Sequence, residues 1–184
     1  MNNLIVKYHN LDTVKLTNLI RKDKDIVRNI QSVILNLPAL NIIYNDELLN
    51  KTIIQANNFA KDKTYFVVFG TGGSNLGSKA LINILQGKEK KKMVFYDNID
   101  PIGFKNSIEQ IDLKTAGYII ISKSGRTYET LSQFASLIEF FDQKNQLDLF
   151  FNNCLVITED KSSPLREIAY QHKCKILNHE IDIG

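Results

Sequence analysis

The 184-residue sequence has no tryptophan, three prolines, nine glycines and two cysteines. So few cysteines exclude a disulfide-stapled fold, and Cys154 and Cys174 lack both a Cys-x-x-Cys spacing and a neighbouring histidine cluster. We therefore expect buried thiols in a reducing compartment and no metal site. The first residues lack a basic segment followed by an apolar one, and no stretch reaches the ~18 apolar residues of a membrane span. These absences predict a cytoplasmic protein that does not interact with membranes.

The chain also lacks a large excess of charge of either sign, because 23 basic and 20 acidic residues give a formal net charge of +3. The basic residues are mostly scattered among acidic ones, so nucleic acid is not an expected partner. The one dense run, at 88–92, falls between a predicted helix and a predicted strand and is interpreted as a solvated turn. A chain of this length can bury a core that needs neither disulfides nor metal.

From residue 64 onward, short β-branched runs alternate with amphipathic stretches, which is typical of βαβ units around a parallel sheet. Two longer stretches, 76–85 and 127–144, carry apolar side chains at helical spacing and are predicted to be helices with one buried face. Leu81 and Ile84 lie on that face of the first. The predicted strands span 65–69, 92–96, 117–121, 153–158 and 174–177.

Shorter helices are predicted after Asp100-Pro101 and Ser163-Pro164, where a capping side chain precedes a proline whose missing N–H costs nothing. The beginning of the chain differs, with helical patterns at 12–37 and 46–61 separated by a break at Leu37-Pro38. We expect an N-terminal helical arm, residues 1–62, followed by an α/β domain, residues 63–184.

Two loops rich in glycine and hydroxyl groups follow the first and third predicted strands. They read GTGGSNLGS at 70–78 and SKSGRT at 122–127. Each opens a helix, where unpaired backbone N–H groups and the positive end of the helix dipole favour an anion. Glycine permits close backbone approach, hydroxyls donate hydrogen bonds, and Lys123 adds a cation. The loops therefore predict a phosphate site.

If both loops serve one ligand, the first and third strands must be neighbours, because open α/β sheets bind ligands where the strand order reverses. This requirement predicts the strand order 2-1-3-4-5. It also places Ser74 and Ser124 across one crevice, into which the Lys123 ammonium is expected to point.

Other motifs fit the first loop poorly. A dinucleotide fingerprint starting at Gly70 needs glycine where Asn75 stands, and a P-loop at 72–77 needs lysine where Ser78 stands. A nucleophile elbow around Ser74 lacks its last glycine. Each loop taken alone also fits a plain strand-to-helix turn. Their pairing on two strands that can be adjacent is what favours a ligand.

Three segments, GTGGSNLG at 70–77, DNIDP at 97–101 and ISKSGRTYET at 121–130, resemble the N-terminal sugar-isomerase (SIS) domain of the glucose-6-phosphate isomerase family. The segments TED at 158–160 and SPLREIA at 163–169 continue the resemblance. It implies a three-layer, flavodoxin-like α/β domain with a five-stranded parallel sheet. It also implies a hexose 6-phosphate ligand and no cofactor.

The resemblance further implies which residues bind the substrate phosphate. Arg126 departs from the Gly-Gly-Thr of many bacterial relatives, and it either adds a cation or points to solvent and stiffens the loop. The residues implicated by matching position are Gly73, Ser74, Ser122, Lys123, Ser124, Gly125 and Thr127.

No catalytic residue is expected in this chain, because the family's general base is a glutamate in a second SIS domain. A Gly-Gly-Arg motif of the family would begin where the sequence ends. His9, His172 and His179 are interpreted as surface or helix-end residues away from both loops. Glu129 is interpreted as a first-turn partner of a helix dipole.

Two functions from different classes fit these observations. In the first, the chain is part of a homodimeric isomerase of glycolysis and gluconeogenesis that interconverts glucose 6-phosphate and fructose 6-phosphate, and it binds the sugar phosphate without isomerising it alone. In the second, it is a free-standing SIS module that senses a phosphosugar without catalysis. A reading frame that continues past Gly184 favours the enzyme, and a stop codon favours the sensor. An isomerase acting on another phosphosugar is a third possibility.

Overall fold

The computed structural model describes residues 12–22, 24–85, 91–108 and 111–183 of the chain. Its contacts divide the chain into two compact units, Met1–Asn45 and Asp46–Gly184. His9, Gly184 and residues 88–90 of the predicted lysine-rich turn lie outside the described residues. Within the described ranges, no helix is long and apolar enough to cross a membrane.

The first unit consists of short helices. A hydrogen bond of 3.0 Å from the Lys15 backbone N–H to the Asp12 carboxylate lies at its first helix. The helical pattern breaks at Leu37-Pro38 as the sequence predicts, because Leu37 is extended and Pro38 opens the next helix. The elements are α1 (Thr13–Lys22), α2 (Lys24–Asn36), α3 (Pro38–Asn41) and the 3-10 turn η1 (Ile42–Tyr44).

The second unit contains a five-stranded parallel sheet in the order β2-β1-β3-β4-β5, which confirms the predicted order. Phe69 aligns with Tyr96 of β2 and with Ile120 of β3, so the carboxyl ends of these strands meet at one edge. The strands are β1 (Tyr65–Phe69), β2 (Lys92–Tyr96), β3 (Ala116–Ile121), β4 (Cys154–Glu159) and β5 (Lys175–His179), each within two residues of its predicted bounds.

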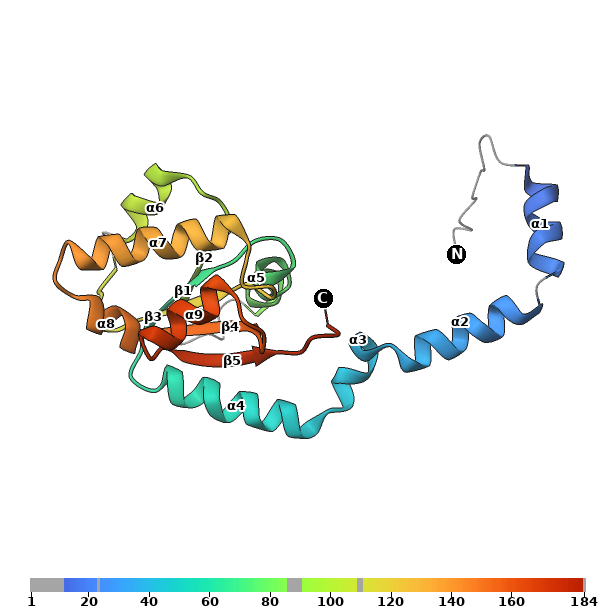
Figure 1. Ribbon diagram of the computed structural model, residues 1–184, viewed down its shortest axis with the longest axis horizontal. Helices are drawn as coiled ribbons and strands as arrows, with labels where there is room; N and C mark the ends of the chain where they lie inside the picture. Colours follow the sequence, from blue (N-terminus) through green and yellow to red (C-terminus); the bar gives the residue numbers. More distant parts are fainter. Residues whose placement is uncertain (1–11, 23, 86–90, 109–110, 184) are drawn as a thin grey trace. The chain divides into compact units, whose positions relative to one another are not determined.

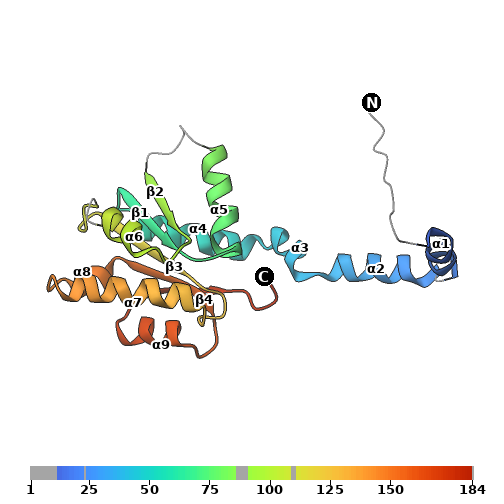
Figure 2. The ribbon, with the colours of Figure 1, turned by 90° about the horizontal axis from the view of Figure 1, so that it is seen from above.

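Helices cover both faces of the sheet and complete a three-layer α/β fold (Figures 1 and 2). α4 and α5 lie on one face, and α6, α7, α8 and α9 lie on the other. The helices are α4 (Asp46–Ala60), α5 (Gly73–Ile84), α6 (Pro101–Ile108), α7 (Tyr128–Asp142), α8 (Leu147–Asn152) and α9 (Pro164–Gln171).

Successive side chains along each strand point to opposite faces of the sheet and pack under the helices on each face. Val67 and Phe69 of β1 face the larger core under α7, whereas Phe66 faces α4, where its ring lies 6.0 Å from that of Phe59. Because Phe59 packs on β1, α4 belongs to the same compact unit as the sheet. The units therefore divide after Asn45, and the expected domain boundary at residues 62 and 63 stays a prediction.

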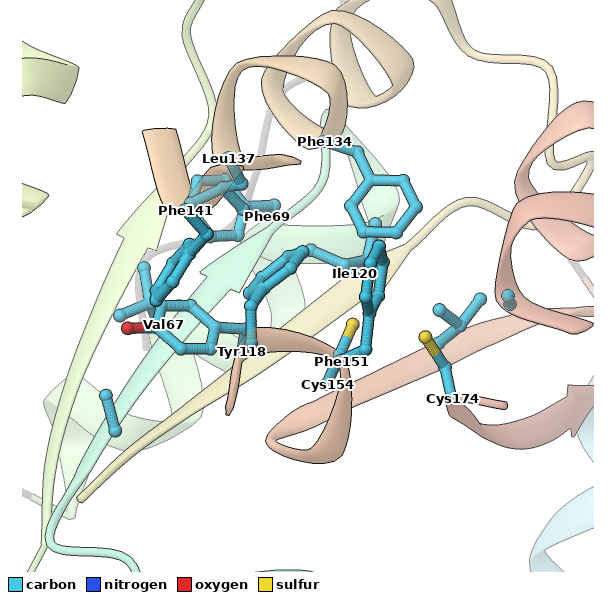
Figure 3. Close-up of a cluster of buried hydrophobic side chains, with 14 of the residues drawn as sticks. Val67, Phe69, Tyr118, Ile120, Phe134, Leu137, Phe141, Phe151, Cys154 and Cys174 are labelled. Atoms are coloured by element: carbon cyan, nitrogen blue, oxygen red, sulfur yellow. The ribbon is translucent and has the colours of Figure 1, made fainter. Parts of the chain in front are cut away.

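The larger core is aromatic at its centre (Figure 3). Tyr118 of β3 meets Phe141 and Phe150 edge-on, with ring centroids 5.4 and 5.2 Å away, and those two phenylalanines stack at 4.8 Å. Burial raises the pKa of the Tyr118 hydroxyl, which therefore stays protonated. Phe150 comes from α8, a short helix that the sequence patterns did not predict.

The two long helices differ in how far their apolar faces are buried. On α7, Phe134 and Phe141 are buried as predicted. The predicted buried face of α5 is wrong, since Leu81 is 57% exposed and Ile84 is 80% exposed. Asn75 is the residue that α5 buries, so this helix contacts the sheet through its first turn and then extends away from it (Figure 2).

The predicted caps of the two shorter helices are confirmed. The Asp100 carboxylate accepts hydrogen bonds from the backbone N–H groups of Ile102 (3.2 Å) and Gly103 (3.0 Å) at the start of α6. The Ser163 hydroxyl accepts one of 3.4 Å from the Arg166 backbone N–H at the start of α9. Both caps satisfy N–H groups that a helix start leaves unpaired.

Replacing Phe141 by alanine is expected to lower the free energy of unfolding by about 3–5 kcal/mol, because it opens a cavity in the aromatic core. The matched control Ile84→Ala removes a mostly exposed side chain, and it should change stability by less than about 0.5 kcal/mol. Urea denaturation followed by circular dichroism measures both values. Equal losses in the two variants would contradict this picture of the core.

Candidate functional site

The first loop leaves β1 at Gly70, where the chain passes close to the end of β3. A side chain at Gly70 would place its Cβ 3.1 Å from the Ile121 carbonyl oxygen and 3.1 Å from Ser74 Cβ. A Cβ here would have to displace these neighbours by a few tenths of an ångström, so glycine suits the close approach. Ser74 therefore lies near the end of β3, in keeping with the pairing of β1 and β3. The placement of Ser74 and Ser124 across one crevice stays a prediction.

Asn75 ties the start of α5 to the ends of β1 and β2. The sequence patterns did not predict this role. Its side chain is fully buried, and its Nδ2 donates hydrogen bonds to the carbonyl oxygens of Gly70 and Tyr96, the latter at 3.1 Å. Its Oδ1 has no hydrogen-bond partner among the described residues. The available signal was a polar residue directly before the predicted helix at 76–85.

The second loop is folded tightly by its own backbone and hydroxyl groups. The Ser122 side chain is buried and shares a hydrogen bond of 2.9 Å with the Thr127 hydroxyl across the loop. The Gly125 backbone N–H donates to the Ser122 carbonyl oxygen at 3.1 Å, and Gly125 has a φ of +64°, which favours glycine. Ser122 therefore supports the loop from within, while Ser124 is exposed.

β4 and α9 hold the second loop from outside. The Lys123 carbonyl oxygen accepts hydrogen bonds from the Glu159 backbone N–H (2.9 Å) and from the Thr158 hydroxyl (3.2 Å). The Gly125 carbonyl oxygen accepts one from the Leu165 backbone N–H at 3.2 Å. These bonds join segments more than thirty residues apart in the sequence, and no local pattern indicates them.

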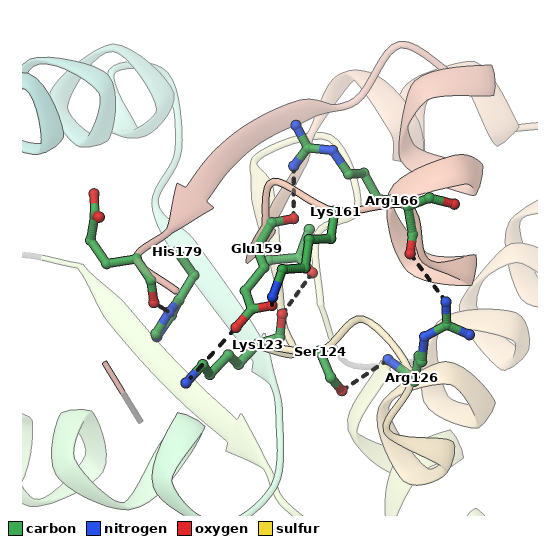
Figure 4. Close-up of polar contacts among 10 residues, drawn as sticks. Lys123, Ser124, Arg126, Glu159, Lys161, Arg166 and His179 are labelled. Atoms are coloured by element: carbon green, nitrogen blue, oxygen red, sulfur yellow. Dashed lines mark hydrogen bonds and ion pairs between the residues drawn. The ribbon is translucent and has the colours of Figure 1, made fainter. Parts of the chain in front are cut away.

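Lys123 forms an ion pair at the end of the neighbouring strand, and its expected direction into a crevice stays a prediction. Its ammonium nitrogen lies 3.8 Å from Glu159 Oε1, and the other carboxylate oxygen lies 3.3 Å from the ammonium of Lys161 (Figure 4). The Lys123 side chain is 37% exposed, so solvent screens this pair. Glu159 is the last residue of β4, so the end of β4 supplies a partner for the Lys123 cation.

Arg126 extends to the opposite side of Ser124 from Lys123 (Figure 4). Its Nη2 donates a hydrogen bond of 3.1 Å to the Ser162 carbonyl oxygen, and its backbone N–H donates one of 3.2 Å to Ser124 Oγ. Of the two alternatives for Arg126, these contacts favour stiffening of the loop.

The helices that follow the two loops start without side-chain caps. Gly72 (φ +55°) and Thr127 occupy the N-cap positions of α5 and α7, and no side chain of the described residues caps either helix start. The Thr127 hydroxyl is instead occupied with Ser122. In the same unit, α6 and α9 are capped by Asp100 and Ser163, whereas α8 also starts without a side-chain cap. The starts of α5 and α7 differ from that of α8 in flanking the β1–β3 junction. Unpaired N–H groups at a helix start favour an anion.

The candidate acid and base residues lie in other settings. Glu129 is exposed in the first turn of α7, as predicted. His172 ends α9 and stacks on Phe151 at 3.9 Å, near the opposite edge of the sheet from the loops. His179 is the last residue of β5, at the same edge as the loops but with β4 between β5 and β3. In the described parts of the chain, no group of three or more histidine, cysteine or acidic side chains could hold a metal ion.

A comparison with models of protein families identifies the family of this chain. The model of the family described as phosphoglucose isomerase matches residues 53–167, a stretch that contains both loops and the start of α9. The chain belongs to this family. A glucose-6-phosphate isomerase from Campylobacter jejuni is 34% identical over 121 residues, which are 62% of this chain and 29% of that protein. A probable glucose-6-phosphate isomerase from Haloarcula marismortui is 30% identical over 122 residues, 66% of this chain and 27% of that protein.

The solved structures agree with the fold. The crystal structure of a glucose-6-phosphate isomerase from Chlamydia trachomatis superposes with a TM-score of 0.65 at 24% identity, covering 76% of this chain and 26% of that one. This phosphoglucose isomerase family member therefore spans less than a third of the length of the glucose-6-phosphate isomerases that it matches.

Replacing Gly125 by alanine is expected to lower the free energy of unfolding by about 2–4 kcal/mol, because a Cβ at positive φ is strained and here would overlap the Ser163 side chain. The matched control is Gly73→Ala, since a Cβ at Gly73 meets nothing within 4 Å. It should change stability by less than about 0.5 kcal/mol. Thermal and urea unfolding measure both, and an undisturbed Gly125→Ala protein would refute the tight contact with α9.

Proposed function

We propose that this chain is the amino-terminal part of a cytoplasmic glucose-6-phosphate isomerase and that its two loops bind the phosphate of the sugar. The observation that carries the proposal is that two uncapped helix starts follow neighbouring strands and lie at one junction. The starts of α5 and α7, at the junction of β1 and β3, have no side-chain cap among the described residues, whereas α6 and α9 are capped. A phosphate would accept hydrogen bonds from these N–H groups and gain from both helix dipoles.

In this proposal the loop residues have distinct roles. The hydroxyls of Ser74 and Ser124 donate to the phosphate oxygens, together with backbone N–H groups around Gly73 and after Gly125 at the two helix starts; the Gly125 N–H itself keeps its bond to the Ser122 carbonyl oxygen. Thr127 and Ser122 share their hydrogen bond in the free protein, and Thr127 turns its hydroxyl to the phosphate on binding. Lys123 adds positive charge at the edge of the site while Glu159 limits its movement.

The reaction of such an isomerase is a proton transfer between C1 and C2 of an open-chain hexose phosphate. The chain contributes position, because an anchored phosphate holds the reacting carbons in one place. The proton-transferring base comes from another part of a longer, homodimeric protein, since Glu129 is exposed beside the phosphate site and would be repelled by a bound phosphate if it turned inward.

Titration with glucose 6-phosphate and with inorganic phosphate is expected to shift the backbone amide NMR signals of Ser74 and Ser124 at millimolar ligand. Ser124→Ala should weaken binding about tenfold, because a hydrogen bond to a charged group contributes about 1.5–3 kcal/mol. The matched control Ser132→Ala removes an exposed hydroxyl from α7 outside the loops, and its affinity should be unchanged. Unmoved amides at both positions would show that the isolated chain does not bind phosphate here.

The isolated chain is expected not to isomerise glucose 6-phosphate. Incubation in heavy water followed by proton NMR measures both fructose 6-phosphate formation and exchange of the C2 proton, with an intact isomerase as positive control. Neither should exceed the background without protein. Activity in the purified chain that is lost in Ser124→Ala would overturn the assignment of the base elsewhere, whereas activity unaffected by this substitution would indicate a contaminating enzyme.

A further inference from the structure

The two cysteines, twenty positions apart in sequence, are neighbours in the fold. Cys154 opens β4 and Cys174 directly precedes β5, and the register pairs the next residues, Leu155 and Lys175. One step back along both parallel strands therefore places Cys154 beside Cys174. Both thiols are free and belong to the same core cluster, with their sulfur atoms on the same side of the sheet (Figure 3). The pair is thus positioned for a bond between the strands.

The two thiols are not equivalent. Cys154 is fully buried, whereas Cys174 retains 9% exposure at the rim of the core. Burial raises the pKa of the Cys154 thiol, and the hydrogen bond that this thiol donates to Cys174 raises it further. The same hydrogen bond lowers the pKa of Cys174. Because the thiolate is the nucleophilic form, Cys174 is the sulfur that reacts first.

We propose that Cys154 and Cys174 form an oxidation site, a dithiol that hydrogen peroxide converts into an intramolecular disulfide. In the first step the Cys174 thiolate attacks one peroxide oxygen, an S–O bond forms, the O–O bond breaks, and the leaving oxygen takes up a proton as water. In the second step Cys154 attacks the sulfur of this sulfenic acid. An S–S bond forms, the S–O bond breaks, and the Cys154 proton leaves with the hydroxide as a second water. The dithiol loses two electrons and the peroxide gains them.

The position of the pair determines what the disulfide would do. The rest of β4 and all of α9 lie between the two cysteines. This segment includes Thr158, Glu159 and Leu165, which hold the second loop. The bond would close this segment into a covalent ring at the edge of the sheet opposite the loops. The candidate phosphate site would be retained, and the elements that support it would be tied together. This inference does not depend on the proposed sugar phosphate.

The test uses the reduced, folded 184-residue chain treated with hydrogen peroxide. Intact-mass spectrometry should show the loss of two hydrogen atoms without formation of a dimer, peptide mapping should link Cys154 to Cys174, and dithiothreitol should reverse both changes. Cys154→Ser should stop at a sulfenic acid on Cys174 that dimedone traps. Cys174→Ser should be oxidised at least about tenfold more slowly, since its remaining thiol is buried and its pKa is raised.

A urea-unfolded sample of the same chain is the control for the chemistry, because both thiols are accessible there. If the unfolded chain is oxidised while the folded chain keeps both thiols, the site does not exist. Disulfides between chains, or equal oxidation rates of Cys154→Ser and Cys174→Ser, would equally overturn the proposal. Circular dichroism of both variants establishes that they are folded before the rates are compared.

Discussion

The pairing of β1 with β3 is the constraint on which the rest of the domain depends. Because β2 returns to the outer side of β1, the chain leaves β1 and β3 toward opposite faces, and α5 and α7 begin on either side of one junction. The close approach at Gly70 then brings Ser74 against the end of β3. Strand pairing thus sets where two helix starts meet, before any particular side chain contributes to the site.

Side chains at this edge of the sheet fall into two groups with different tasks. Asp100 and Ser163 satisfy the starts of α6 and α9, and Asn75 and Ser122 hold the loops in shape. The hydroxyl of Ser124 and the backbone around Gly73 are left toward solvent. An anion site needs both groups, since donors must be unpaired and yet rigidly held. The surrounding strands and α9 provide that rigidity.

Much of this arrangement was predictable from the sequence because it depends on local chemistry. The strand bounds follow from the periodicity of apolar residues. The caps at Asp100 and Ser163 follow from a proline directly after a capping residue. The strand order follows from the assumption that the two loops bind one ligand. The exposed face of α5 was not predictable, because amphipathic spacing at Leu81 and Ile84 says nothing of the direction in which the helix leaves the sheet. Contacts between strands could not be predicted either, because no single segment encodes them. Examples are the hydrogen bond from Thr158 to Lys123, the ion pair of Lys123 with Glu159, and the proximity of the two cysteines.

The contact between Gly125 and α9 carries a consequence for how sequences of this kind can diverge. The α-carbon of Gly125 faces the Ser163 side chain, so the space for bulk is shared between two positions that lie far apart in the sequence. A larger residue at position 163 would press the second loop away from α9, while a smaller one without a hydroxyl would loosen it and also remove the cap of α9. Positions 125 and 163 should therefore change together in related proteins. The residue that caps the helix after β4 thus restricts the shape of the loop after β3.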